Sequence, residues 1–204
     1  MALYIDKPMH EYLEDLAAKK PSPGGGSAAA LSASIGASLM CMVANYTVGN
    51  PKYKDVEMEV ADIMMKVSAL RSDLEGLIDD DVKAYETLSA AMKKFKKRSA
   101  QLDKAYKDAI RPPYEVCRIA DELLKLCERL SACGNKNLIT DTAIAAIMLE
   151  GAFFSAKYNV YENLKYVDDI DFIGQAHKFL SPLEESVPKL KEDILEKCEE
   201  AIAR

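Results

Sequence analysis

The chain has 204 residues, of which 49% are hydrophobic and 29% are charged, and its formal net charge is −6. This length suits one domain with a real core, and the composition is that of a globular chain rather than a disordered one. The acidic balance disfavours a nucleic-acid partner, because a negative surface repels phosphate backbones.

The cysteines and histidines restrict the chemistry further. Five cysteines occur, an odd number with no CxxC pair, and residues 1–20 mix charges rather than forming a secretory signal. We therefore expect reduced thiols and a cytoplasmic location. The two histidines, His10 and His177, are too few for a histidine zinc site or a Ser-His-Asp triad, and we expect no metal site.

Helical periodicity runs through the chain, and strand signals are nearly absent. Asp6 is placed to cap a first helix, which ends at the Pro- and Gly-rich run 21–26. Ser27 is then expected to cap a second helix that reaches about Val48 and stops at the Gly-Asn-Pro sequence that follows.

The second helix lies in a stretch without charge, from Lys20 to Lys52, and could be mistaken for a membrane span. Its first half is mostly Ala, Ser and Gly, which gives weak hydropathy. A buried central helix is therefore the better interpretation, and we expect no association with a membrane.

The third element is one very long helix from Lys54 to about Phe95, without proline and with Gly76 as its one glycine. Two series at seven-residue spacing form a heptad-like buried seam along it. The first series is Val56, Ile63, Leu70, Leu77, Ala84 and Ala91, and the second is Val60, Val67, Leu74, Asp81, Leu88 and Phe95.

The rest of the chain is also predicted to be helical. A polar linker at Lys96–Gln101 precedes a helix at Leu102–Ile110, which we expect to break or kink at the adjacent prolines 112 and 113 before a helix at Tyr114–Ala132. Thr140 is placed to cap a helix from Asp141 to about Leu164, and Asp171–Arg204 is amphipathic with bends near prolines 182 and 188. The sequence therefore predicts an all-α, multi-helix orthogonal or up-down bundle with one very long central helix, in a single domain covering residues 1–204.

Asp81 is the one charged residue in the apolar seam of the long helix. Its neighbours Asp79 and Asp80 fall off the seam and are expected to be solvated. A carboxylate inside a bundle is costly unless partners hold it, and burial raises its pKa toward the range of a general acid or base. The alternatives are that Asp81 pairs with a Lys or Arg of another helix, or that the register slips at Gly76.

Other polar positions allow both a structural and a functional interpretation. The glycines at 24–26 precede a helix and expose backbone N–H groups that suit an anion or a carbonyl oxygen, or they form a tight turn. Asp141 suits a helix start, and the basic run Lys93–Arg98 suits either a solvated helix end or the anionic tail of a substrate.

Four motifs occur in order along nearly the whole chain. They are the run Pro21–Ala30 continuing to Met42–Thr47, the Asp-x-x-Ala-aromatic sequence at Asp81–Tyr85, the Gly-Asn-x-Asn segment from Gly134 to Asp141, and the Asn-Val-x-x-Asn-Leu sequence at Asn159–Leu164. In these motifs the chain resembles the formiminotetrahydrofolate cyclodeaminase / methenyltetrahydrofolate cyclohydrolase family, and Asn45–Gly49 is more similar to its stand-alone members.

The resemblance implies a helical bundle, usually a homodimer, that acts on a reduced folate without a metal or a bound organic cofactor. It places the catalytic carboxylate at Asp81. It also implies a set of substrate-binding residues, namely Gly24, Gly25, Gly26, Ser27, Asn45, Asn135, Asn137, Asp141, Asn159 and Asn163.

The reaction that we expect is the cyclodeaminase reaction, in which 5-formiminotetrahydrofolate gives 5,10-methenyltetrahydrofolate and ammonia. The alternative is the cyclohydrolase reaction, in which water opens the methenyl bridge to give 10-formyltetrahydrofolate. A further alternative is a folate-binding or helical interaction protein without turnover. The motifs do not distinguish these possibilities.

Overall fold

The computed structural model describes residues 3–95 and 99–203, and within these ranges it contains helices and no strand. The helices in chain order are η1 (Tyr4–Asp6), α1 (Met9–Ala17), α2 (Gly25–Asn45), η2 (Pro51–Val56), α3 (Glu57–Lys94), α4 (Ala100–Cys133), η3 (Lys136–Leu138), α5 (Ile139–Leu164) and α6 (Ile170–Ile202), where η marks a short 3-10 helix. The all-α prediction is confirmed.

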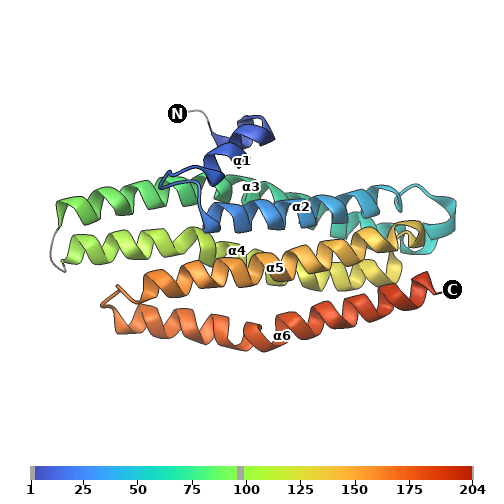
Figure 1. Cartoon of the computed structure of the whole chain (residues 1–204). Coiled ribbons are helices and arrows are strands. Elements are labelled where there is room, and N and C mark those ends of the chain that lie inside the picture. The colour runs from blue at the N-terminus through green and yellow to red at the C-terminus, as the bar shows by residue number, and fades with distance from the viewer. Residues whose placement is uncertain (1–2, 96–98, 204) are drawn as a thin grey trace.

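The five long helices, α2 to α6, lie side by side along one axis, so the bundle is of the up-down rather than the orthogonal kind (Figure 1). The short helix α1 lies outside them, across α2 and α3. Helix α2 has 21 residues and α3 has 38, and α3, α4 and α5 all continue past the N-terminal end of α2 (Figure 1). This difference in length leaves the start of α2 inside the bundle rather than at its end.

The seam of α3 is buried as its heptad spacing predicts. Val60, Val67, Leu74 and Leu88 each expose at most 3% of their surface. They belong to one hydrophobic cluster with residues of α2, α4, α5 and α6. The long central helix is therefore held by burial of its apolar stripe, which is the main source of helix stability in proteins.

Two apolar stretches are long enough to cross a membrane by length and composition, α2 and the stretch Lys136–Leu164. In α2, 61% of the most apolar window is buried inside the bundle, as expected for a core helix, whereas the share for the second stretch is 39%. Much of the apolar surface of α5 therefore faces outward.

Several predicted helix ends are wrong. Helix α2 begins at Gly25 with Gly24 as its N-cap, so Ser27 lies inside the first turn, and the helix ends at Asn45 rather than near Val48. The cap residue of α1 is Pro8 instead of Asp6, and that of α5 is Leu138 instead of Thr140. None of these three caps provides a side-chain hydrogen bond, so the usual cap residues were misleading signals.

The sequence predicts a break or a kink at Pro112 and Pro113. The break does not occur, because α4 continues through both prolines, and the kink stays a prediction. Proline inside a helix costs about 3 kcal/mol through a lost hydrogen bond and a steric clash. Both prolines are buried, and apolar residues on either side, such as Ile110 and Val116, are almost fully buried. Packing therefore outweighs the local cost, and α6 likewise continues as one curved helix through Pro182 and Pro188 (Figure 1).

The linker predicted at Lys96–Gln101 is shorter than expected. Ser99 caps α4 by accepting a hydrogen bond from the Leu102 amide, and the helix begins at Ala100. Residues 96–98 lie outside the described part of the chain. Lys93 and Lys94 form the exposed last turn of α3, where a cation favours the negative end of the helix dipole.

Candidate active site

The glycines at the start of α2 bring that helix into contact with α3. A Cβ atom on Gly26 would lie 2.6 Å from the Asp81 Cγ and 2.8 Å from its Oδ2, which no real side chain tolerates. A Cβ atom on Gly25 would lie 3.3 Å from the side-chain nitrogen of Asn159. The glycine run is therefore a point of close approach between three helices, and not only a turn.

The Asp81 carboxylate closes the N-terminal end of α2. Its Oδ2 accepts a hydrogen bond of 2.9 Å from the backbone N–H of Ser27. That N–H belongs to the first turn of the helix, where no intrahelical acceptor exists, and the cap residue Gly24 has no side chain to replace it. The carboxylate also lies at the positive end of the helix dipole. Asp81, which belongs to α3, thus provides the hydrogen-bond acceptor that an N-cap side chain usually provides within its own helix.

Burial raises the pKa of Asp81 to about 6, while the hydrogen bond from the Ser27 amide acts in the opposite direction. No ion pair with a Lys or Arg is formed by Asp81 within the described residues, and α3 passes through Gly76 without interruption. Neither structural alternative for this residue is therefore observed. A carboxyl group with a pKa near 6 can hold or release a proton close to neutral pH, which suits a general acid or base.

Asp79 is buried, so the prediction that it is solvated is wrong. It exposes 6% of its surface, and its carboxylate accepts hydrogen bonds from the backbone amides of Tyr4 at 2.7 Å and Ile5 at 3.2 Å. The periodicity of α3 could not show this, because the N-terminal segment covers a face that the helix alone would leave open. Asp80 is exposed, as predicted, and pairs with Lys83 at 3.1 Å.

A cavity of about 150 Å³ opens beside the Asp81 carboxylate at the start of α2. Six of the residues that the sequence predicted for the site line it, namely Gly24, Gly25, Gly26, Asp81, Asn159 and Asn163. Ser27 contributes through its hydrogen bond to the carboxylate. Residues from α2, α3 and α5, distant in sequence, therefore meet at one cavity.

Four residues that line the cavity were not predicted as site residues: Pro21, Ser22, Tyr85 and Ala109. Tyr85 follows Asp81 by four positions on a helix, so it lies on the same face and could have been found from that spacing. Pro21 and Ser22 precede the glycines directly. Ala109 carries no signal in the sequence, because a small residue in an amphipathic helix is ordinary.

The two asparagines of α5 line the cavity, and the side-chain nitrogen of each is engaged in a hydrogen bond within the helix. The side-chain nitrogen of Asn159 donates to the Ser155 carbonyl at 2.9 Å, and that of Asn163 donates to the Asn159 carbonyl at 3.1 Å. Their side-chain oxygens have no described hydrogen-bond donor and are therefore available to N–H groups of a ligand.

The remaining predicted site residues, Asn45, Asn135, Asn137 and Asp141, do not reach this cavity within one chain. They lie at the other end of α2, which at 1.5 Å per residue is about 30 Å away. Asn135 is buried there, and it donates to the Tyr46 carbonyl at 2.9 Å and accepts from the Asn137 amide at 3.0 Å. These bonds join the α4–α5 connection to the end of α2, and a role in substrate binding stays a prediction.

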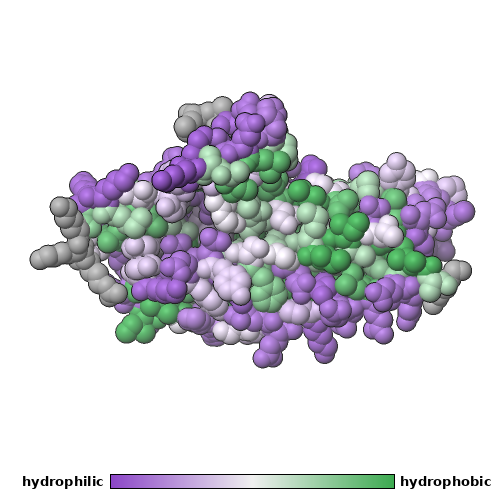
Figure 2. All heavy atoms as spheres, in the orientation of Figure 1, coloured by the Kyte–Doolittle hydropathy of each residue, from purple (hydrophilic) through white to green (hydrophobic). Residues whose placement is uncertain are grey.

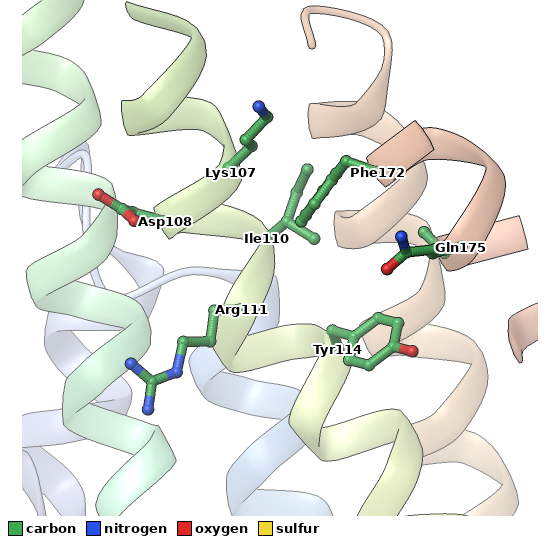
Figure 3. Close-up of a pocket in the computed structure, with 8 residues that line it drawn as sticks. Lys107, Asp108, Ile110, Arg111, Tyr114, Phe172 and Gln175 are labelled. Carbon is green, nitrogen blue, oxygen red and sulfur yellow. The ribbon is translucent and has the colours of Figure 1, made fainter. Parts of the chain in front are cut away.

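A larger cavity of about 370 Å³ lies between α4 and α6 (Figure 3). Phe172, Gln175 and Tyr114 face one another across it, while the side chains of Asp108 and Arg111 point away toward α3 (Figure 3). It contains none of the predicted site residues. The smaller cavity at Asp81 is therefore the candidate active site.

Comparisons of the sequence with known proteins point to one family. The family model described as formiminotransferase-cyclodeaminase matches residues 8–181. A methenyltetrahydrofolate cyclohydrolase of Methylorubrum extorquens is 36% identical over 192 residues, which cover 91% of this chain and 92% of that protein. The formimidoyltransferase-cyclodeaminase of Sus scrofa is 30% identical over 186 residues, and the match covers 88% of this chain and 34% of that longer protein.

The fold has a close match among solved structures. The crystal structure of formiminotetrahydrofolate cyclodeaminase from Thermotoga maritima superimposes with a TM-score of 0.90 at 30% sequence identity, covering 97% of this chain and 98% of that one. From the family model, the sequence relatives and the shared fold, we conclude that the chain belongs to the formiminotransferase-cyclodeaminase family of folate one-carbon enzymes.

Proposed function

We propose that the protein acts on the one-carbon unit between N5 and N10 of a reduced folate, with Asp81 as the general acid and base, and that its reaction is the cyclodeaminase reaction. The observation that carries this proposal is the half-buried Asp81 carboxylate, which lines a cavity at the start of α2 and has a pKa raised to about 6 by burial. The family of the chain supports the substrate class.

In the proposed reaction, N10 of 5-formiminotetrahydrofolate attacks the carbon of the protonated formimino group, whose nitrogen becomes a neutral amine. Asp81 accepts the N10 proton, the tetrahedral intermediate collapses, and the same carboxyl group returns a proton to the amine that leaves as ammonia. A single group can do both only if it exchanges its proton near neutral pH, as a carboxyl with this pKa does. The acceptor oxygens of Asn159 and Asn163 would orient the N–H groups of the folate.

The cavity is smaller than the 300–1,000 Å³ typical of sites that enclose a whole drug-sized ligand. We therefore expect it to hold the reacting part of the substrate, with the remainder lying outside. Our proposal needs no metal or bound organic cofactor, and activity should persist after dialysis against a chelator.

A second candidate is the cyclohydrolase reaction, favoured by the 36% identity with the Methylorubrum extorquens enzyme over nearly the full length of both chains. Here Asp81 would take a proton from the water that attacks the methenyl carbon, and the bond from that carbon to N5 would then break as the hydroxyl proton passes to N5. The change at the reacting carbon is similar, so the same carboxyl group serves either reaction.

Two assays of the purified protein separate these reactions. With 5-formiminotetrahydrofolate, the cyclodeaminase releases ammonia and forms the methenyl chromophore, whereas with 5,10-methenyltetrahydrofolate the cyclohydrolase removes that chromophore. If neither substrate is changed, calorimetry with the reduced folate tests binding. The absence of turnover with both substrates would contradict the proposal, and binding without turnover would favour the folate-binding alternative.

We further propose that the protein is a cytoplasmic homodimer formed through the outward face of α2 and α5. Ile35 of α2 and Ile144 and Ile147 of α5 expose 41%, 46% and 51% of their surface, and Met65 of the adjacent α3 exposes 64%. Figure 2 shows hydrophobic side chains gathered over this face, on the half of the molecule that carries the C-terminal end of α2. An apolar face of this kind suits a second copy of the chain, because most oligomers of soluble proteins are two-fold dimers.

A further inference from the structure

The N-terminal segment of the chain is fastened to the helix that carries Asp81. The Asp79 carboxylate holds the backbone amides of Tyr4 and Ile5, as described above. Tyr4 in turn packs edge-on against the ring of Tyr12, with the ring centroids 5.5 Å apart. These contacts place Tyr12 of α1 against the start of α2 and leave it only 3% exposed.

Tyr12 is connected to Asp81 through one residue. Its hydroxyl lies 3.2 Å from the Ser27 Oγ, and the backbone N–H of Ser27 donates to the Asp81 Oδ2 at 2.9 Å. Ser27 is fully buried. Within the described residues, the Tyr12 hydroxyl and the Ser27 hydroxyl have no other hydrogen-bond partner, so each depends on the other for its hydrogen bond.

We propose that Tyr12 is a positioning residue for Asp81, acting through Ser27. This inference rests on the proposed function for the role of Asp81 in turnover, but the geometric link is independent of the reaction. The hydroxyl of Tyr12 fixes the Ser27 side chain, and thereby fixes the first turn of α2 and the direction of the amide that holds the carboxylate. The local helix alone cannot do this, because its cap residue is a glycine.

The surroundings of the carboxylate make this one amide important. Tyr12 from α1, Tyr85 from α3, Ala109 from α4 and two asparagines from α5 surround the carboxylate and the cavity, and no cation is among them. Asp79 lies two residues away on α3 and is occupied by the backbone amides that it holds. The Ser27 amide is therefore the main described group that favours the ionised form of Asp81.

The test compares Tyr12→Phe, which removes only the hydroxyl, with Tyr161→Phe as a matched control. Tyr161 donates a hydrogen bond to Glu184 on the side of α5 that faces α6. The pKa of the Asp81 carboxyl is measured by 13C NMR in each protein, and kcat and KM are measured with the folate substrate. We expect Tyr12→Phe to raise the pKa of Asp81 and to lower kcat about 3- to 10-fold with little change in KM, since a loosened amide stabilises the carboxylate less.

Ser27→Ala provides a second variant, because it removes the other end of the same hydrogen bond and keeps the backbone amide. It should reproduce the effects of Tyr12→Phe, and the double variant should be no worse than either single one. An unchanged pKa of Asp81 in Tyr12→Phe would overturn the inference, whether or not the protein turns over a folate. A wild-type protein that transforms neither folate would instead refute the proposed function and leave the NMR comparison intact.

Discussion

At the scale of single residues, the candidate site depends on one half-buried carboxyl group, which has no cation beside it among residues 3–95 and 99–203. Such a group carries a cost that depends on pH. The pKa of Asp81 is raised by burial from 3.8 to about 6. The folded state therefore binds more protons than the unfolded state between these two values, and the free energy of unfolding falls as the pH rises through that window.

Asp81→Asn should consequently be more stable than the wild type at pH 7.5. The shift from 3.8 to about 6 corresponds to at most about 3 kcal/mol, and the difference should nearly vanish at about pH 3, where the wild-type carboxyl is mostly protonated in both states. Urea unfolding of both proteins at the two pH values measures this difference. The exposed Asp80 provides the control, since Asp80→Asn should change the free energy of unfolding by less than about 0.5 kcal/mol.

The sequence was sufficient to single out Asp81, because one acidic residue interrupts an apolar seven-residue series. It was not sufficient to place Asp79, whose burial depends on a segment 75 positions away in the chain. Tyr12 was missed for the same reason. Its contact with Ser27 depends on how α1 lies across the bundle, and periodicity within one helix carries no such information.

At the scale of helices, the site exists because α2 and α3 approach each other closely at Gly26. Gly26→Ala should lower kcat by a large factor, on the order of 100-fold, because the new Cβ atom would displace the Asp81 carboxylate. Steady-state kinetics measure the loss of kcat, and thermal unfolding measures the effect on stability separately.

The matched control is Gly76→Ala, at an exposed position of α3 where a Cβ atom would meet nothing within 4 Å. It should keep full activity and gain about 0.5–1 kcal/mol of stability from its higher helix propensity. Wild-type kinetics in Gly26→Ala would show that the close approach of the two helices does not matter for the reaction.

The existence and type of the long helices could be predicted from apolar spacing, and α3 is the clearest case. The ends of the helices, and the continuity of α4 through its two prolines, could not be predicted, because cap residues and prolines are weak local signals. Burial of Ile110, Val116 and their neighbours outweighs two prolines, and Leu138 instead of the expected Thr140 is the N-cap of α5. Tertiary packing decides such positions, and one sequence without the fold does not reveal it.

At the scale of the whole molecule, the outward apolar face of α2 and α5 predicts the assembly. In light scattering after gel filtration we expect twice the 22.5 kDa mass of the chain. Ile144→Asp should reduce this to the mass of one chain, since a charge would be buried without a partner. Ile170→Asp is the matched control, because Ile170 is 82% exposed on α6 and lies outside this face. A single-chain mass in the wild type would contradict the dimer.

The measurement that tests the role of Asp81 most directly is the pH dependence of kcat/KM, from pH 5 to 9, for the wild type and Asp81→Asn. We predict that the wild type loses activity as the pH falls through about 6, where Asp81 takes up its proton. We also predict that Asp81→Asn is at least about 100-fold slower at every pH, as expected when a general acid or base is removed. An Asp81→Asn protein with the rate and the pH profile of the wild type would contradict the account.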